Sequence, residues 1–397
     1  MKGSSKIMNA ELDREVKITK TSPDGRPAEY EFPNGTKIAI EFVSTIYEPK
    51  SEDDEEQCTY CKVIKLEHSG ENNGTLLATR ETVGGGDDFY PIYESRDDGR
   101  SWKEIAVVRD DFNESGKAGW QPCLYELPTD IGDFKEGTVI LGGCSRNAGR
   151  GISKSMMTLY KSVDCGKHWE GFATISKWGG IGNGIWEPYI IYEEKSGRLY
   201  CFYSEDFPPE HSQQLVYKYT TDMVNWSEKR LCVSCDDPKL RPGMISIAKL
   251  GNGKYYMAFE MVGFDGIPIY YKETDDLDKW DIPSYGTPIV SNEGKTFGTA
   301  PAVSWTPLGG EQGTMFVTGQ HMVKGTSASG TDMFVSFDCG RTFYNIDNPI
   351  GYVLKNRVRC GYSSGMFADK DGALYYSNDT NYGENNEKMM FAKITVK

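Results

Sequence analysis

Six times along the chain, two runs of apolar residues flank a short polar turn that ends in a glycine. Each of these glycines is followed by one variable residue and then by an apolar residue. Apolar runs on both sides of a tight glycine turn predict the two strands of a β-hairpin. The turns recur about every 60 residues, which predicts six similar units. The six glycines are Gly74, Gly137, Gly197, Gly253, Gly313 and Gly372.

A second motif follows each of the first five hairpins at a similar distance along the chain. Its form is S-x-D-x-G-x-x-W, the Asp box, in which the aspartate can bond backbone N–H groups of its own turn and the glycine supplies a positive φ. We therefore interpret these aspartates as structural. Clear copies span Ser95–Trp102, Ser162–Trp169 and Ser336–Phe343, and weaker copies carry Thr220, Asp222 and Trp226, and Glu273, Asp275 and Trp280.

Units of this length hold about four short strands each, and their radial repetition builds a propeller. The sequence thus predicts an all-β protein, a six-bladed β-propeller with Asp-box (BNR) repeats, over residues 36–397. Residues 1–35 are interpreted as an N-terminal extension. We expect the segment Lys37–Phe42 to close the ring by adding a strand to the last blade, near Met389–Val396.

Composition narrows the classes of partner. The net charge of −14 argues against nucleic acid, because phosphate binding needs a basic face, and it suits a neutral substrate. Nothing reads as a membrane span, since no run of about 18 apolar residues occurs. The first residues lack the apolar core of a signal peptide, so we expect a cytoplasmic protein unless a signal has been removed. We also expect a monomer.

The ten cysteines show no compact disulfide framework. Two C-x-x-C pairs, Cys58/Cys61 and Cys232/Cys235, resemble a split zinc site. The two pairs lie far apart in the chain, and no nearby histidine completes either one. We therefore interpret them as free thiols and expect no metal and no cofactor.

Two glutamates are predicted to face one opening of the channel. The first strand of a blade lines the channel and the second returns antiparallel, so the start of the first and the end of the second share a rim. Glu187 stands ten residues before Gly197, and Glu260 stands seven after Gly253. Two carboxyl groups facing one sugar ring are the minimum for glycoside hydrolysis. The alternative is a salt bridge from either glutamate to Arg241.

Aromatic residues gather on the same predicted rim. Sugar rings stack on such side chains, so a carbohydrate site would use them. Part of the set is equally suited to filling space between the blades. The candidates are Trp120, Trp186, Tyr203 and Tyr362.

Several stretches resemble glycoside hydrolase family 93, the exo-arabinanases, within the sialidase-like Asp-box superfamily. The more specific ones are Trp186-Glu187-Pro188 and Arg241-Pro242-Gly243-Met244. The resemblance implies an exo-acting enzyme that releases arabinobiose from α-1,5-linked L-arabinan with retention of configuration. It maps two catalytic glutamates onto Glu187, taken as the acid/base, and Glu260, taken as the nucleophile, although sequence leaves their order open. It also implies that Trp120, Gln121, Arg241 and Tyr362 bind sugar hydroxyls or shape the site.

Two alternatives remain. A sialidase would use Tyr362 as its nucleophile, and it would need three arginines to grip the substrate carboxylate, with Arg241, Arg146, Arg357 and Arg359 as candidates. The absence of an early Arg-Ile-Pro segment and the acidic net charge disfavour it. The other alternative is a non-catalytic carbohydrate-binding propeller, since folds of this kind also serve as scaffolds.

Overall fold

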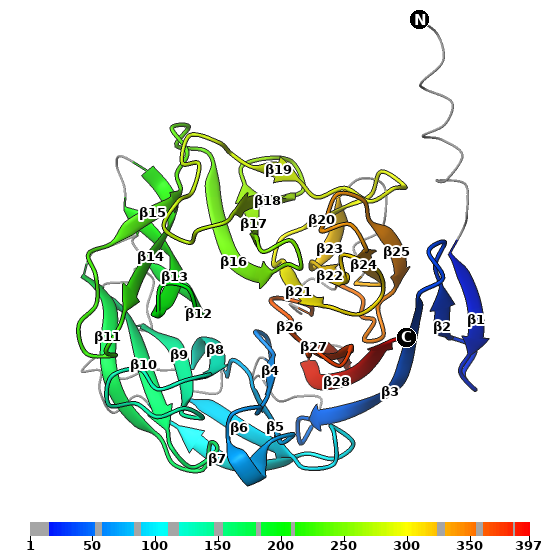
Figure 1. Ribbon diagram of the computed structural model, residues 1–397, viewed down its shortest axis with the longest axis horizontal. Helices are drawn as coiled ribbons and strands as arrows, with labels where there is room; N and C mark the ends of the chain where they lie inside the picture. Colours follow the sequence, from blue (N-terminus) through cyan, green and yellow to red (C-terminus); the bar gives the residue numbers. More distant parts are fainter. Residues whose placement is uncertain are drawn as a thin grey trace, which may run out of the picture.

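The computed structural model describes residues 16–51, 58–82, 89–109, 119–146, 154–179, 184–207, 211–323, 330–354, 360–383 and 386–397. Over these residues the chain forms strands, one 3-10 turn (η1, Gly70–Asn72) and no α-helix. The strands build six sheets arranged radially around a central axis (Figure 1). The predicted all-β six-bladed propeller is confirmed.

Each blade is an antiparallel sheet whose first strand lies innermost. The first three blades are β4 (Lys62–Lys65), β5 (Leu76–Thr79), β6 (Tyr90–Ser95) and β7 (Lys103–Val108); β8 (Trp120–Glu126), β9 (Val139–Arg146), β10 (Lys154–Ser162) and β11 (Glu170–Gly179); and β12 (Ile185–Glu193), β13 (Arg198–Phe207), β14 (His211–Thr220) and β15 (Arg230–Val233).

The remaining three blades follow the same order. They are β16 (Arg241–Lys249), β17 (Tyr255–Val262), β18 (Ile269–Thr274) and β19 (Thr287–Pro288); β21 (Ala302–Thr306), β22 (Thr314–Thr318), β24 (Asp332–Ser336) and β25 (Tyr344–Asp347); and β26 (Gly365–Ala368), β27 (Ala373–Tyr382), β28 (Asn386–Val396), β3 (Lys37–Tyr47), β2 (Pro27–Glu31) and β1 (Lys17–Thr21). A separate two-stranded sheet joins β20 (Thr296–Gly298) to β23 (His321–Val323).

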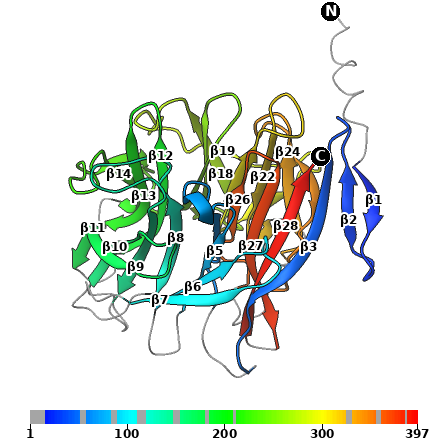
Figure 2. The ribbon, with the colours of Figure 1, turned by 60° about the horizontal axis from the view of Figure 1, so that its bottom comes forward.

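The ring is closed by the pairing of β3 with β28. The two strands run antiparallel, with Ile38 opposite Val396 at one end and Tyr47 opposite Met389 at the other. This is the closure that the sequence predicted. β1 and β2 continue the sheet outward, so part of the predicted N-terminal extension lies in strands on the outside of the sixth blade (Figure 2). Residues 1–15 lie outside the described part of the chain.

Apolar side chains fill the spaces between blades, and this packing holds the ring together. The space between the third and fourth blades, for example, is filled by Tyr200, Phe202, Met257 and Phe259, none of which has exposed surface. Burial of such side chains is the main favourable contribution to folding. Within the described residues, no helical segment has the length and apolar character needed to span a bilayer.

The Asp-box residues bond within their own turns. Asp97 accepts hydrogen bonds from the Ser95 hydroxyl at 2.8 Å and the Ser101 backbone N–H at 2.9 Å. The Trp102 indole donates to the carbonyl of Gly99 at 3.0 Å. The hydrogen bond from the Ser101 side chain, together with a smaller effect of the Ser101 backbone N–H, lowers the pKa of Asp97 to about 2. These contacts keep the aspartate on the outer surface of the blade, away from the channel.

The innermost strands line a channel cavity of about 370 Å³. The predicted hairpin glycines connect first and second strands at one end of it, and those at positions 197 and 253 have φ values of 68° and 81°. The opposite end is therefore formed by the starts of the first strands and the ends of the second strands. We call this end the mouth.

Replacing Phe391 by alanine should destabilise the ring closure. The Phe391 side chain on β28 is fully buried, and its ring lies 5.3 Å from that of Trp102 in the first blade. Truncating a buried phenylalanine typically lowers the free energy of unfolding by about 3–5 kcal/mol. Denaturant unfolding measures the change, and Val224→Ala, at a side chain that is 72% exposed, is the control. Equal stability of both variants would contradict the assigned role of this contact.

Candidate functional site

Every blade bends sharply where its first strand begins. The residue at the bend has a positive φ although it is not glycine, and the values run from 50° to 67°. Such conformations are costly and concentrate at functional sites, where they turn side chains in directions that a regular strand does not allow. We call these residues the mouth ring: Tyr60, Gln121, Glu187, Met244, Ala300 and Ser363.

In three consecutive blades the bend coincides with a break in strand register. The pairing of β8 with β9 shifts between Trp120 and Cys123, and that of β12 with β13 between Trp186 and Tyr189. The pairing of β16 with β17 shifts between Gly243 and Ser246. Bulges of this kind re-aim a side chain beside the ladder. The same device thus aims Gln121, Glu187 and Met244 at the mouth.

Members of the mouth ring are joined by hydrogen bonds. The Gln121 side-chain amide donates to the Tyr60 hydroxyl at 3.2 Å, and its carbonyl oxygen accepts the backbone N–H of Glu187 at 3.2 Å. The Tyr60 ring also meets the Tyr362 ring edge to face, with centroids 5.5 Å apart. Met244 and Ala300 pack in the same small cluster. The mouth-ring residues therefore form one connected layer at the mouth of the channel, which we call the floor.

The Glu187 carboxylate is held by three donors. The Tyr60 hydroxyl donates to Oε1 at 3.3 Å, and the Ser204 hydroxyl and the Met244 backbone N–H donate to Oε2 at 2.9 Å and 3.0 Å. Hydrogen bonds to a carboxylate stabilise its charged form. This environment suits a carboxylate that acts as an anion.

Glu260 lies at the end of β17 and is only 6% exposed. Its Oε2 accepts hydrogen bonds from the Thr299 hydroxyl and, at 3.0 Å, from the Ala300 backbone N–H. Burial raises the pKa of Glu260 above its usual value, although these two donors and the charge of Arg241 oppose the shift. A carboxyl group of this kind holds a proton at higher pH than an exposed one, as a general acid requires.

Arg241 pairs with an aspartate, and neither catalytic candidate is its ion-pair partner. Its guanidinium lies 3.0 Å from an oxygen of Asp206 and donates to the Gln213 side-chain carbonyl at 2.7 Å. The Trp186 indole N–H donates to the other Asp206 oxygen at 3.0 Å. Asp206 therefore fixes a tryptophan and an arginine side by side at the mouth.

A lysine lies next to the mouth ring on β4. The Lys62 ammonium donates to the Ser363 hydroxyl at 2.7 Å and to the carbonyls of Ser363 and Ser364 at 3.0 Å and 3.3 Å. Burial lowers the pKa of Lys62 to about 8, against the opposing charges of neighbours that include Glu187. The positive charge of Lys62 lies close to Glu187 and offsets part of the negative charge of its carboxylate.

Most of the predicted site residues meet at the mouth. Glu187, Gln121 and Arg241 lie there with the contacts given above, and Trp186 and Tyr362 are half-buried beside them. Trp120 begins β8 next to Gln121, is also half-buried, and packs partly against the core between the second and third blades.

Tyr203 is the exception. It has no exposed surface and lies in the core between the second and third blades, so its ring is not available to a sugar. The prediction that it binds substrate was wrong because successive side chains of a strand point to opposite faces. Its neighbour Ser204 points to the mouth and holds Glu187.

Other contributors were missed by sequence analysis. Tyr60, Ser204, Asp206 and Thr299 hold the predicted residues in place. Ser204 and Asp206 could have been found from the phase of β13, which follows the Gly197 turn. Arg357 and Arg359, candidates for gripping a sialic acid carboxylate, lie outside the described residues, as does the side chain of Arg146.

Comparison with known proteins gives matches among solved structures. No protein-family model and no curated protein matches the chain. An α-L-arabinofuranosidase from Fusarium graminearum, in complex with an iminosugar inhibitor, is 26% identical with a TM-score of 0.75, and the match covers 90% of this chain and 98% of the other. A Penicillium chrysogenum α-L-arabinanase complexed with arabinobiose is 27% identical with a TM-score of 0.75, covering 89% and 98%.

A third match is the family 93 α-L-arabinofuranosidase of Fusarium graminearum with arabinobiose, at 27% identity and a TM-score of 0.74, covering 88% of this chain and 96% of the other. These neighbours share the propeller over nearly its full length. The chain is a glycoside hydrolase. Its similarity to family 93 agrees with the sequence motifs that first indicated that family.

Replacing Tyr60 by phenylalanine should slow this hydrolase without unfolding it. The change removes one of three donors to Glu187 and the acceptor of Gln121, while the ring contact with Tyr362 remains. A lost hydrogen bond to a charged group costs about 1.5–3 kcal/mol, which corresponds to roughly 10- to 150-fold in kcat of glycoside hydrolysis. Steady-state kinetics measure the effect, and thermal unfolding checks the fold. Tyr219→Phe, in the outer part of the third blade, is the control.

Proposed function

We propose that this hydrolase cleaves α-1,5-linked L-arabinan or its oligosaccharides from the non-reducing end and releases arabinobiose. The observation that carries the proposal is the placement of Glu187 and Glu260 at one mouth, in a fold whose family 93 neighbours are described with arabinobiose bound. A glycoside hydrolase needs two carboxyl groups that flank the scissile bond.

The surroundings of the two glutamates support different roles for them in the retaining mechanism proposed here. Three donors stabilise the anion of Glu187, which suits a nucleophile. Burial raises the pKa of Glu260, which suits an acid/base. This order is the reverse of the one first expected from sequence, where the motifs did not distinguish the two environments.

The proposed reaction proceeds in two steps. A Glu187 oxygen forms a bond to the anomeric carbon while the glycosidic C–O bond breaks, and Glu260 gives its proton to the departing oxygen. Glu260, now a carboxylate, then takes a proton from water as the water oxygen bonds to the anomeric carbon and the ester to Glu187 breaks. Two inversions at one carbon retain its configuration.

The mouth favours a neutral chain end as substrate. The mouth ring lies at one end of the channel, and a site at the end of a channel suits an enzyme that acts at the end of a polysaccharide. The charge of Arg241 is offset by Asp206, so this arginine is better suited to sugar hydroxyls than to a carboxylate. The pairing makes the sialidase alternative weaker, and the Trp186 ring beside it offers a stacking surface.

Glu187→Gln and Glu260→Gln should each lower the release of arabinobiose from linear arabinan by about 10²–10⁴-fold or more, because each removes a group that reacts in the transition state. Product analysis by chromatography measures the loss. Glu193→Gln is the matched control, since Glu193 is a buried glutamate at the opposite end of β12, the strand that carries Glu187.

The assay also separates the alternatives. Full activity in either glutamine variant would remove that glutamate from the mechanism. Turnover of a chromogenic sialoside in place of arabinan would favour the sialidase, and binding without turnover would favour the scaffold. With an activated aryl arabinoside, azide should rescue Glu187→Ala to give an inverted azide product and Glu260→Ala to give a retained one. A retained product from Glu187→Ala and an inverted product from Glu260→Ala would reverse the roles assigned to the two glutamates.

Thr299→Ala should move the alkaline limb of the activity profile to higher pH. The Thr299 hydroxyl stabilises the charged form of Glu260, so its removal raises the pKa of Glu260 further. A general acid works while it is protonated, and activity falls as pH rises through its pKa. The pH dependence of kcat/KM for the variant and for Thr306→Ala, on the inner strand of the fifth blade, provides the comparison. An unchanged or lowered limb would contradict the assignment of Glu260.

A further inference from the structure

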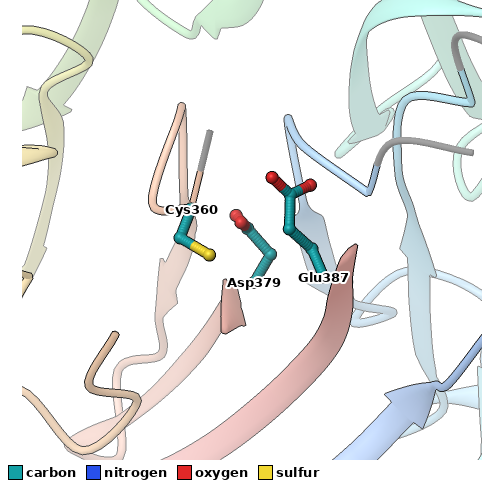
Figure 3. Close-up of side chains that lie close together, drawn as sticks. All are labelled: Cys360, Asp379 and Glu387. Atoms are coloured by element: carbon teal, nitrogen blue, oxygen red, sulfur yellow. The ribbon is translucent and has the colours of Figure 1, made fainter. Parts of the chain in front are cut away.

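Three buried side chains with metal-ligating atoms lie together where the last blade meets the first. Cys360 precedes β26, Asp379 lies on β27 and Glu387 on β28, and one ligand atom of each lies within 4.8 Å of the others. All three are buried. Figure 3 shows the Asp379 carboxylate between the Cys360 sulfur and the Glu387 carboxylate.

The first C-x-x-C motif reaches the same place. The backbone N–H of Cys58 donates to Glu387 at 3.2 Å, and the Cys61 thiol donates to the carbonyl of Cys58 at 3.3 Å. Neither cysteine has exposed surface. The motif and the three-residue group stand at opposite ends of the sequence, and closure of the ring brings them together.

Burial and the mutual repulsion of these groups disfavour their ionised forms. Burial, followed by the charges of Glu387 and Cys58, raises the pKa of Asp379 well above its usual value. Burial also raises the pKa of Cys360, with Asp379, Glu387 and Cys58 adding to the shift. Groups that disfavour one another's negative charge are the groups that a divalent cation stabilises, and a bound metal deprotonates its thiol ligands.

The chemistry of the donors selects the kind of ion. Thiolates favour zinc and related transition metals, whereas calcium and magnesium take oxygen ligands. Structural zinc sites have four ligands drawn from cysteine, histidine and carboxylates. The second pair, Cys232/Cys235, lies elsewhere, packed in the core between the third and fourth blades.

We propose that Cys360, Asp379 and Glu387 form a site for a divalent ion of the zinc class, with water in the fourth position. Binding replaces the proton of the Cys360 thiol and that of any protonated carboxyl with the metal and releases these protons to solvent. The site is separate from the glutamate pair and does not depend on the identity of the sugar.

The position of this site gives it a structural consequence. Cys58 and Cys61 enclose Tyr60, and Cys360 lies two residues before Tyr362. The backbone N–H of Tyr60 donates to the carbonyl of Tyr362 at 2.9 Å, and their rings are in contact. A metal here would fix the segment that leads to Tyr362 and the Glu387 carboxylate that accepts the Cys58 N–H, and so would stiffen the contact between the last blade and the first.

The test is metal loading of the full-length protein. After reduction and removal of metal, the protein should take up one equivalent of zinc that survives dialysis, measured by elemental analysis, and its thermal unfolding temperature should rise. Cobalt(II) in place of zinc should give the intense near-ultraviolet charge-transfer absorption of thiolate ligation. No retained zinc in the wild type, or a disulfide at these cysteines, would overturn the proposal.

Two variants and a matched control locate the ion. Cys360→Ser and the nearly isosteric Asp379→Asn should both lose the cobalt–thiolate band and the retained zinc. Cys232→Ser, which alters the other C-x-x-C pair, should keep both. Circular dichroism confirms that the proteins compared are folded. Retention of the metal by a folded Asp379→Asn or Cys360→Ser variant, or its loss from folded Cys232→Ser, would place the ion elsewhere.

Discussion

The left-handed bends at the starts of the inner strands are the constraint on which the site depends. A non-glycine residue with positive φ costs about 1–3 kcal/mol and persists only where the surrounding structure determines it. Here each bend is held by its blade, and the blades are held by closure of the ring. The bends turn side chains toward one another across the channel, so that Tyr60, Gln121 and Glu187 form one hydrogen-bonded floor.

That floor separates the environments of the two glutamates. Glu187 belongs to it and accepts several hydrogen bonds, whereas Glu260 comes from a second strand and is buried beside Thr299 and Ala300. Burial raises the pKa of Glu260, and the donors around Glu187 stabilise its charged form, so the two carboxyl groups suit the two roles proposed for them. The Arg241–Asp206 pair beside them presents polar groups with little net charge, as a neutral sugar requires.

Sequence predicted the parts of this molecule that depend on local chemistry or strand phase. Glycine turns recur with each blade, so the number of blades could be predicted. The distances of Glu187 and Glu260 from their hairpin turns placed both residues at one mouth. The alternation of side chains along β13 was misassigned at Tyr203. An error of one residue along a strand exchanges the core side for the channel side, as its neighbour Ser204 shows. The contact of Cys58 with Glu387 could not be predicted from sequence, because it arises from ring closure across most of the chain.

Closure by β3 and β28 also bears on how the protein is made. The strand that completes the last blade is synthesised before the other five blades, and its partner is synthesised after them. While the ribosome is still working, β3 has an unpaired edge, and such edges favour association with other chains. Folding of the sixth blade must therefore wait until β28 has been synthesised, and production of this protein should be sensitive to crowding among nascent chains.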